Sequence, residues 1–151
     1  MPQYLEMTAD KFTFRVATDR LYTKEGVWVL PEADGKRVRV GVADYLQQHN
    51  GDVAFANVKA AGTKLAAGDQ FAEIETIKAM VDMHAPVTGT IVEVNAALNA
   101  SPEAVNQSPY EAGWLAVMEP SAWVAERSKL LGPAAYFAVM QAQVREDLKS
   151  L

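Results

Sequence analysis

Residues 72–86 carry the run Ala72-Glu73-Ile74-Glu75-Thr76-Ile77-Lys78-Ala79-Met80-Val81-Asp82-Met83-His84-Ala85-Pro86. Apolar and polar side chains alternate on both sides of its centre, a period typical of half-buried strands. We predict strands over Phe71–Ile77 and Met80–Pro86, and each strand should bury one apolar face. Lys78 then lies where the chain reverses, on a hairpin tip that holds its amine clear of the protein.

Further strands are predicted on the N-terminal side of this run. Alternating apolar residues occur at Phe12, Phe14 and Val16, at Val27 and Val29, and at Val38, Val40 and Val42. Asp34-Gly35 is a strong hairpin turn, because both residues accept a positive φ. A short helix is predicted over Asp44–His49, with Asp44 as its cap and Asn50-Gly51 as its end. Val53–Val58 alternates again.

The C-terminal half begins with the same β character and becomes helical. Gly62, Gly68 and Thr88-Gly89 indicate turns, and strands are predicted over 90–94 and 114–118. Ser101-Pro102-Glu103 has the composition of a helix start. After Pro120, helices are predicted over 121–131 and 134–148. The second carries one apolar stripe, which we expect to pack on the β core: Phe137, Met140, Val144 and Leu148. We predict one domain over residues 1–151, with its core at about 20–120 and a helical tail at 121–151.

Composition excludes several classes of function. The formal net charge is −5 and no Lys/Arg cluster is present, which argues against a nucleic-acid partner. The chain has no cysteine, so thiolate nucleophiles, Cys-ligated metals and disulfides are excluded. Any reactive sulfur must therefore be attached from outside. No apolar run is long enough to cross a bilayer and no secretory signal is visible, so we expect a cytoplasmic protein without a membrane partner.

Lys78 has the features required of a swinging-arm carrier. Such a carrier needs one accessible primary amine on a stiff base, because a tethered group then meets its partners at a high effective concentration. Glu73, Glu75 and Asp82 are expected to surround this amine with negative charge and to help a basic ligase find it. Spacing alone does not establish the role, since an exposed turn lysine is usually a solvated residue.

The same run resembles the lipoyl-lysine hairpin of the glycine cleavage system H protein family. The resemblance lies in Glu75-Thr76-Ile77-Lys78-Ala79, followed by Asp82 and Ala85-Pro86. It extends over roughly residues 20–140 through spaced motifs in the family's order. These are Tyr22-Thr23-Lys24, Trp28-Val29, Val40-Gly41-Val42, Asp44-Tyr45, Gly51-Asp52, Val94-Asn95, Leu98, Pro102-Glu103, Val105-Asn106, Pro109-Tyr110 and Gly113-Trp114.

The resemblance implies a mainly β barrel-sandwich hybrid with short helices, and lipoate joined covalently to Lys78. It implies supporting roles for Glu75, Asp82 and His84. The implied partners are a lipoate ligase or lipoyltransferase, then glycine decarboxylase, aminomethyltransferase and dihydrolipoamide dehydrogenase. Biotinyl domains share this fold but frame their lysine with methionines. Ile77 and Ala79 flank Lys78 here, which favours lipoate.

Some positions depart from the family pattern. Gly26-Val27 stands before Trp28 where the family has His-Glu, and Val81 and His84 replace a Ser and a Tyr. These family positions lie near the arm, so their loss should weaken its docking. The departures bring in a second group, the H-protein-like lipoate-binding proteins of bacterial sulfur oxidation, which work with a heterodisulfide-reductase-like complex. The sequence leaves both pathways open.

Two alternatives come from other classes of protein. An enzyme is disfavoured, because His49 and His84 have no second ligand at metal spacing and no nucleophile elbow or phosphate loop is present. An unmodified binding module that keeps the lysine hairpin remains open. We therefore predict a non-enzymatic carrier without a metal site.

Overall fold

Two antiparallel sheets enclose the main apolar core of the computed structural model, which describes residues 2–150. Met1 and Leu151, the ends of the predicted domain, lie outside the described residues. The larger sheet contains, in spatial order, β3 (Leu21–Tyr22), β4 (Val27–Glu32), β5 (Arg37–Val42), β11 (Ala116–Pro120), β10 (Gly89–Val94) and β7 (Lys64–Leu65). The smaller sheet contains β6 (Val53–Val58), β8 (Gln70–Thr76) and β9 (Met80–His84). The predicted mainly β class is confirmed.

The main core lies between these sheets because the inward positions of both are apolar. It is built largely from valine, isoleucine and leucine, whose removal from water drives such packing. Its fully buried members include Val27, Val29, Val38, Val40, Phe71, Val87, Ile91, Leu115 and Met118. The alternation read from the sequence therefore identified the longer strands of both sheets but not the two-residue strands β3 and β7.

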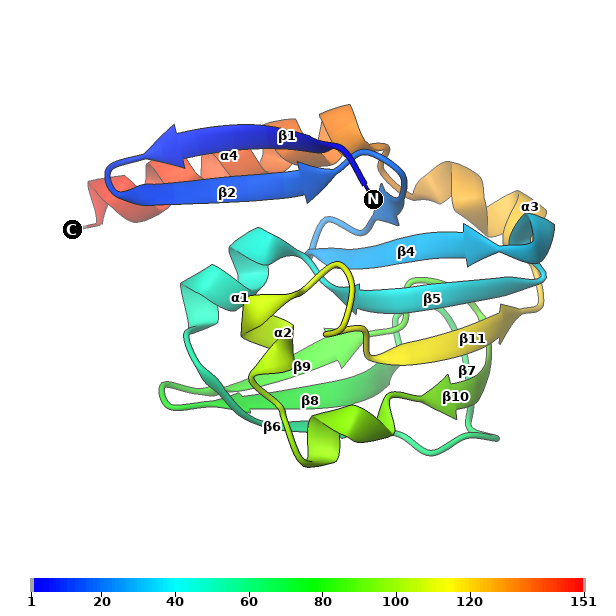
Figure 1. The fold of residues 1–151 in the computed structure, drawn as a ribbon. Helices are drawn as coiled ribbons and strands as arrows, with labels where there is room; N and C mark the ends of the chain where they lie inside the picture. The colour runs from blue at the N-terminus through cyan, green and yellow to red at the C-terminus, as the bar shows by residue number, and fades with distance from the viewer. Residues whose placement is uncertain (1, 151) are drawn as a thin grey trace.

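The N-terminal hairpin and the last helix form a separate layer. Within residues 2–150, β1 (Tyr4–Ala9) pairs only with β2 (Phe12–Ala17), and α4 (Pro133–Lys149) packs against this hairpin. Figure 1 shows the layer on the side of the larger sheet, away from β6, β8 and β9. Its buried residues form a second apolar cluster together with Tyr22, Trp28, Ala43, Tyr45 and Tyr110, and the Tyr136 ring stacks on Tyr22 at 4.5 Å between centroids.

The packing of α4 differs from the prediction. The helix packs on the second apolar cluster and not on the main core. Met140 and Val144 are buried as predicted, but Leu148 is 40% exposed. Tyr136, outside the predicted stripe, is buried in its place. The hairpin to which α4 binds is contributed by distant sequence, so helical periodicity alone did not identify this partner.

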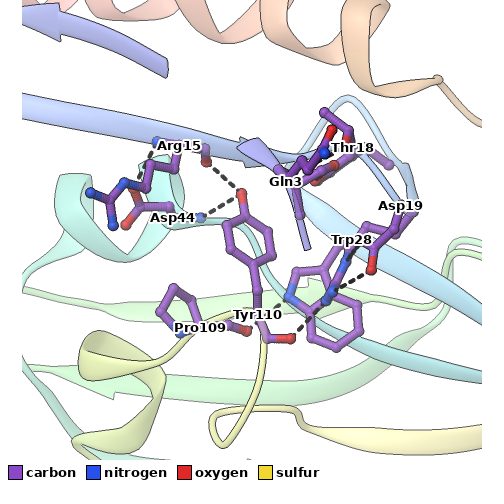
Figure 2. A network of polar contacts seen from close by, with 11 residues as sticks. Gln3, Arg15, Thr18, Asp19, Trp28, Asp44, Pro109 and Tyr110 are labelled. Carbon is purple, nitrogen blue, oxygen red and sulfur yellow. Dashed lines mark hydrogen bonds and ion pairs between the residues drawn. The ribbon is translucent and has the colours of Figure 1, made fainter. Parts of the chain in front are cut away.

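Tyr110 joins the hairpin layer to α1 (Asp44–Asn50), as Figure 2 shows. Its hydroxyl donates a hydrogen bond to the Arg15 carbonyl oxygen at 2.6 Å and accepts one from the Asp44 N–H at 3.3 Å. The Asp44 carboxylate accepts from the Arg15 N–H at 2.9 Å. Asp44 was predicted to cap the helix, but the N-cap is Ala43, without a side-chain bond. The Asp44 carboxylate instead accepts a hydrogen bond from the Arg15 N–H on the unpaired edge of β2.

Several predicted boundaries shift by one or two residues. The predicted strand 114–118 is β11, and the predicted helix 121–131 divides into α3 (Trp123–Glu126) and η3 (Arg127–Lys129). The remaining short helices are η1 (Ala33–Gly35), η2 (Ala96–Asn99) and α2 (Ala104–Gln107). The α2 N-cap is Glu103, so Ser101 does not cap the helix with its side chain. No helix among residues 2–150 has the length and apolar character to span a membrane.

Trp28 is the largest fully buried side chain and lies where the two clusters meet. Its indole N–H donates to the Pro109 carbonyl oxygen at 2.9 Å, and the Arg20 guanidinium lies 4.6 Å from its ring centroid. The ring covers Gly41 on the neighbouring strand β5. A Cβ added at Gly41 would collide with Cζ2 and Cε2 of the Trp28 ring, closer than real contacts allow.

Gly41→Ala is therefore expected to destabilise the protein by about 1–3 kcal/mol, because the fixed indole ring has to move. Gly132→Ala is the matched control, since a Cβ at Gly132 meets no atom within 4 Å. We expect it to change stability by no more than about 0.5 kcal/mol. Chemical denaturation measures both values, and equal stabilities would contradict this account of the Trp28 contact.

Asp147 ties the end of α4 to α1. Tyr45 Oη donates to Asp147 Oδ2 at 2.5 Å, and His49 Nδ1 lies 3.2 Å from the same oxygen. Burial opposes ionisation of Asp147, but hydrogen bonds from Tyr45 and Gln143 and the neighbouring His49 outweigh it. They hold the pKa of Asp147 below its ordinary value of 3.8. The tie therefore stabilises the fold above that pH, and this stability is lost as the pH falls through the lowered pKa.

Asp147→Asn is expected to lower the Tm at pH about 6 and to reduce the loss of Tm between pH about 6 and about 3, because the titrating group is gone. Glu146→Gln is the control on the exposed side of the same helix turn. Thermal melts across this pH range measure both variants. A pH dependence unchanged by Asp147→Asn would show that the contacts of Asp147 with Tyr45 and His49 contribute nothing to stability.

Candidate functional site

Lys78 lies in the loop that joins β8 to β9, the position predicted from the sequence. The two strands are antiparallel, and Glu75 opposite Met80 is their last pair before the loop. The Thr76 N–H donates to the Ala79 carbonyl oxygen at 2.9 Å, which closes the loop. Residues 77–80 are all exposed. The hairpin therefore presents the Lys78 amine to solvent on a hydrogen-bonded base.

Thr76 holds the shape of this loop. Its side chain is buried, and its Oγ1 accepts hydrogen bonds from the Lys78 N–H at 3.2 Å and the Ala79 N–H at 3.1 Å. The hydroxyl thus replaces the backbone acceptor that a regular hairpin would offer to Ala79. Sequence reasoning did not assign this role. The available signal was a hydroxyl residue two positions before the turn residue, the pattern of a side-chain turn.

The Lys78 side chain lies over Gly51. Its Cε would be 3.6 Å, and its Cδ 4.0 Å, from a Cβ built on that glycine. Gly51 ends α1 with φ of +86°, a conformation that favours glycine at the end of a helix. The sequence predicted Gly51 as the helix end but not its place under the lysine. The end of α1 therefore supports the aliphatic stem of Lys78.

The acidic residues expected around the amine, Glu73, Glu75 and Asp82, lie on β8 and β9 next to the loop. Among residues 2–150, no carboxylate forms an ion pair with Lys78. Asp82 faces Glu73 across the strand pair, and its Oδ1 accepts from Gln70 Nε2 at 3.2 Å. Glu75 is one strand pair closer to the tip, opposite Met80. No side chain of the described residues 2–150 therefore forms an ion pair with the Lys78 amine.

His84 lies at the other end of β9 from Lys78. Its ring Nδ1 is 2.7 Å from Glu25 Oε2, and its backbone N–H donates to Glu25 Oε1 at 3.1 Å. Val81, expected on the buried face of its strand, packs against the main core. The structure thus places His84, but not Val81, at the far end of β9 from the lysine.

The space beside Gly26, where the family has a histidine, is occupied by α4. A Cβ on Gly26 would lie 3.2 Å from Tyr136 Oη and 3.4 Å from Leu46 Cβ, and the φ of this residue is +103°. A larger residue at position 26 would be strained in this backbone conformation and crowded by the tyrosine. The position of Tyr136 therefore explains why a glycine fits at position 26, although the two residues are far apart in sequence.

The site fits an amide-linked arm. Lys78 offers a primary amine that is exposed, free of an ion pair with residues 2–150 and rooted on a loop with satisfied backbone groups. Its stem rests on the only residue type without a Cβ. A long acyl chain can leave this position without displacing any packed element.

A two-sheet β domain with an exposed lysine on a hairpin tip is the arrangement expected of a carrier of the barrel-sandwich hybrid type. The model of the family described as Glycine cleavage H-protein matches residues 20–143. The chain belongs to the glycine cleavage H-protein family. The N-terminal hairpin, residues 4–17, lies outside the matched range.

Relatives with the same family name confirm this assignment. The "Glycine cleavage system H protein" of Beutenbergia cavernae is 43% identical over 128 residues, which are 85% of this chain and 98% of that protein. The one of Thermus thermophilus is 39% identical over the same shares. The crystal structure of the H protein from Mycobacterium marinum superposes with a TM-score of 0.72 at 34% identity, covering 80% of this chain and 95% of that one. The predicted barrel-sandwich hybrid is confirmed, whereas the sulfur-oxidation alternative finds no support in these relatives.

Thr76→Val is expected to speed amide exchange at Lys78 and Ala79 and to lower stability by about 1 kcal/mol, because both N–H groups lose their acceptor. Thr76→Ser keeps the hydroxyl and is expected to retain most of the protection. Hydrogen exchange followed by NMR resolves the two amides. If valine and serine variants exchanged alike, the hydroxyl would not be what shapes the loop.

Proposed function

We propose that this protein is a lipoyl carrier of glycine cleavage, with lipoate joined by an amide bond to Lys78. The observation that carries the proposal is the exposed Lys78 amine at the β8–β9 tip, free of any ion pair with residues 2–150 and with its stem over Gly51. The family assignment supports lipoate as the attached group. Ile77 and Ala79 beside the lysine favour lipoate over biotin.

Attachment is an acyl transfer to Lys78 Nζ. The neutral amine attacks the carbonyl carbon of an activated lipoyl donor, such as an acyl-adenylate. The N–C bond forms as the bond to the leaving nucleotide breaks, and the nitrogen releases one proton. The exposed tip leaves the approach to Nζ open, and Thr76 keeps the loop from collapsing over it.

The attached group supplies a dithiolane, the reactive sulfur that this cysteine-free chain lacks. The residues of the chain hold the root of the arm and leave its free end mobile, which gives the carried group a high effective concentration near each partner. The partners we propose are glycine decarboxylase, aminomethyltransferase and dihydrolipoamide dehydrogenase, with the aminomethyl group as cargo. The chain itself performs no step beyond carriage.

We also propose that residues 1–151 act as one carrier domain. The contacts of Tyr110 with Arg15 and Asp44, and of Asp147 with Tyr45, support this, because they join both terminal segments to the part that bears Lys78. The segment 121–151, predicted as a tail, then covers the second apolar cluster and is not a free appendage.

Lys78→Arg is expected to abolish lipoylation completely while leaving the Tm within about 2 °C, because an exposed tip side chain buries little surface. Lys11→Arg is the matched control: Lys11 is also an exposed lysine in a hairpin turn, between β1 and β2. Intact-mass spectrometry after co-expression with a lipoate ligase and lipoate measures the increment.

The lipoyl mass should appear in the wild-type protein and in Lys11→Arg and be missing in Lys78→Arg. An unmodified wild-type chain under these conditions would favour the binding-module alternative. An increment that persists in Lys78→Arg would place the attachment elsewhere, and a large fall in Tm would make Lys78 a structural residue.

A further inference from the structure

Large apolar side chains gather on the surface around Lys78. Six are exposed among residues 2–150, and three of them lie at this end of the small sheet: Phe55, Ile77 and Met80. Phe55 is 59% exposed, Ile77 77% and Met80 55%. Phe55, Glu75 and Met80 stand opposite one another on β6, β8 and β9, so they share one face of the sheet. Because the fold does not bury these side chains, their apolar surface is available for contact with another molecule.

The next row of residues on the same face carries two carboxylates. Asn57, Glu73 and Asp82 stand opposite one another, two residues further from the tip on each strand. Two like charges placed directly opposite each other destabilise a strand pair. Among residues 2–150 no cation forms an ion pair with Glu73, Glu75 or Asp82. The fold therefore keeps a locally unfavourable charge pair that a basic partner would relieve.

We name this surface the tip face: Phe55, Glu73, Glu75, Ile77, Met80 and Asp82. We propose that the tip face is the docking surface for the enzyme that attaches lipoate, and that the enzyme meets it with an apolar patch flanked by basic side chains. This inference rests on the proposed function. It adds which residues of the chain the attaching enzyme recognises.

The geometry of the attachment step favours the attaching enzyme as the partner that binds the tip face. The attaching enzyme forms a bond at Lys78 Nζ, so its active site must come to the root of the arm and cover the residues beside it. The enzymes that act on the loaded carrier meet the dithiolane at the far end of a long flexible chain. Their chemistry therefore takes place farther from the tip face than the bond formed at Lys78 Nζ.

The test measures the rate of lipoylation of the complete unmodified protein by a purified lipoate ligase with ATP and lipoate, followed by intact mass. Phe55→Ser and Met80→Ser are expected to lower kcat/KM about tenfold, mainly through KM, since they remove apolar contact at the centre of the interface. Phe12→Ser is the matched control, because Phe12 is 55% exposed on the distant N-terminal hairpin. It should react at the wild-type rate.

Charge is tested separately. Glu73→Gln combined with Asp82→Asn is expected to lower kcat/KM about fivefold at low salt and to flatten its dependence on ionic strength. Glu103→Gln combined with Asp10→Asn removes the same charge from exposed positions elsewhere and should keep the wild-type salt dependence. Circular dichroism verifies that every variant is folded.

The outcomes distinguish a failure of the docking proposal from a failure of the proposed function on which it rests. If the wild-type protein is not lipoylated at Lys78, the proposed function fails. If it is lipoylated and the tip-face variants react like their controls, only the docking surface is overturned. Variants that lipoylate normally but slow turnover with the glycine cleavage enzymes would assign the tip face to those partners and overturn its assignment to the attaching enzyme.

Discussion

The burial of one face of β8 and β9 against the larger sheet is the constraint on which the site depends. Phe71, Ile74 and Met83 are held in the main core, so the register of the strand pair cannot slip without exposing them. With the register fixed, the chain must reverse just beyond Glu75 and Met80. Lys78 is exposed because the residues on either side of the loop are anchored, and the lysine needs no contact of its own.

The hairpin layer adds a second core without approaching the lysine directly. Its effect on the site passes through α1, which packs against β2 and carries Gly51 at its end. Asp44 at the start of this helix and His49 near its end are bound to the hairpin and to α4, respectively. The terminal segments thus hold the short helix whose C-cap residue, Gly51, lies under the Lys78 stem. They also place Tyr136 where the family pattern has a polar side chain at position 26.

Apolar packing and charge are arranged differently on the two faces of the small sheet. The inner face is largely apolar and supplies stability, whereas the outer face combines exposed apolar residues with the like charges of Glu73 and Asp82, which stand opposite each other. Such a surface fits the docking role proposed for it. The same three strands therefore serve as one wall of the core and as the contact surface around the arm.

The sequence by itself determined the strands other than β1, β3 and β7, most turns, the tip position of Lys78 and the family, because alternation, glycine placement and the motif around Lys78 are local properties of the chain. It did not determine that Gly51 lies under Lys78, that Asp82 bonds to Gln70, or that α4 packs on the N-terminal hairpin. These contacts join residues far apart in sequence or across a strand register, and local periodicity contains no information about which distant surface is met. Only the tertiary structure brings them together.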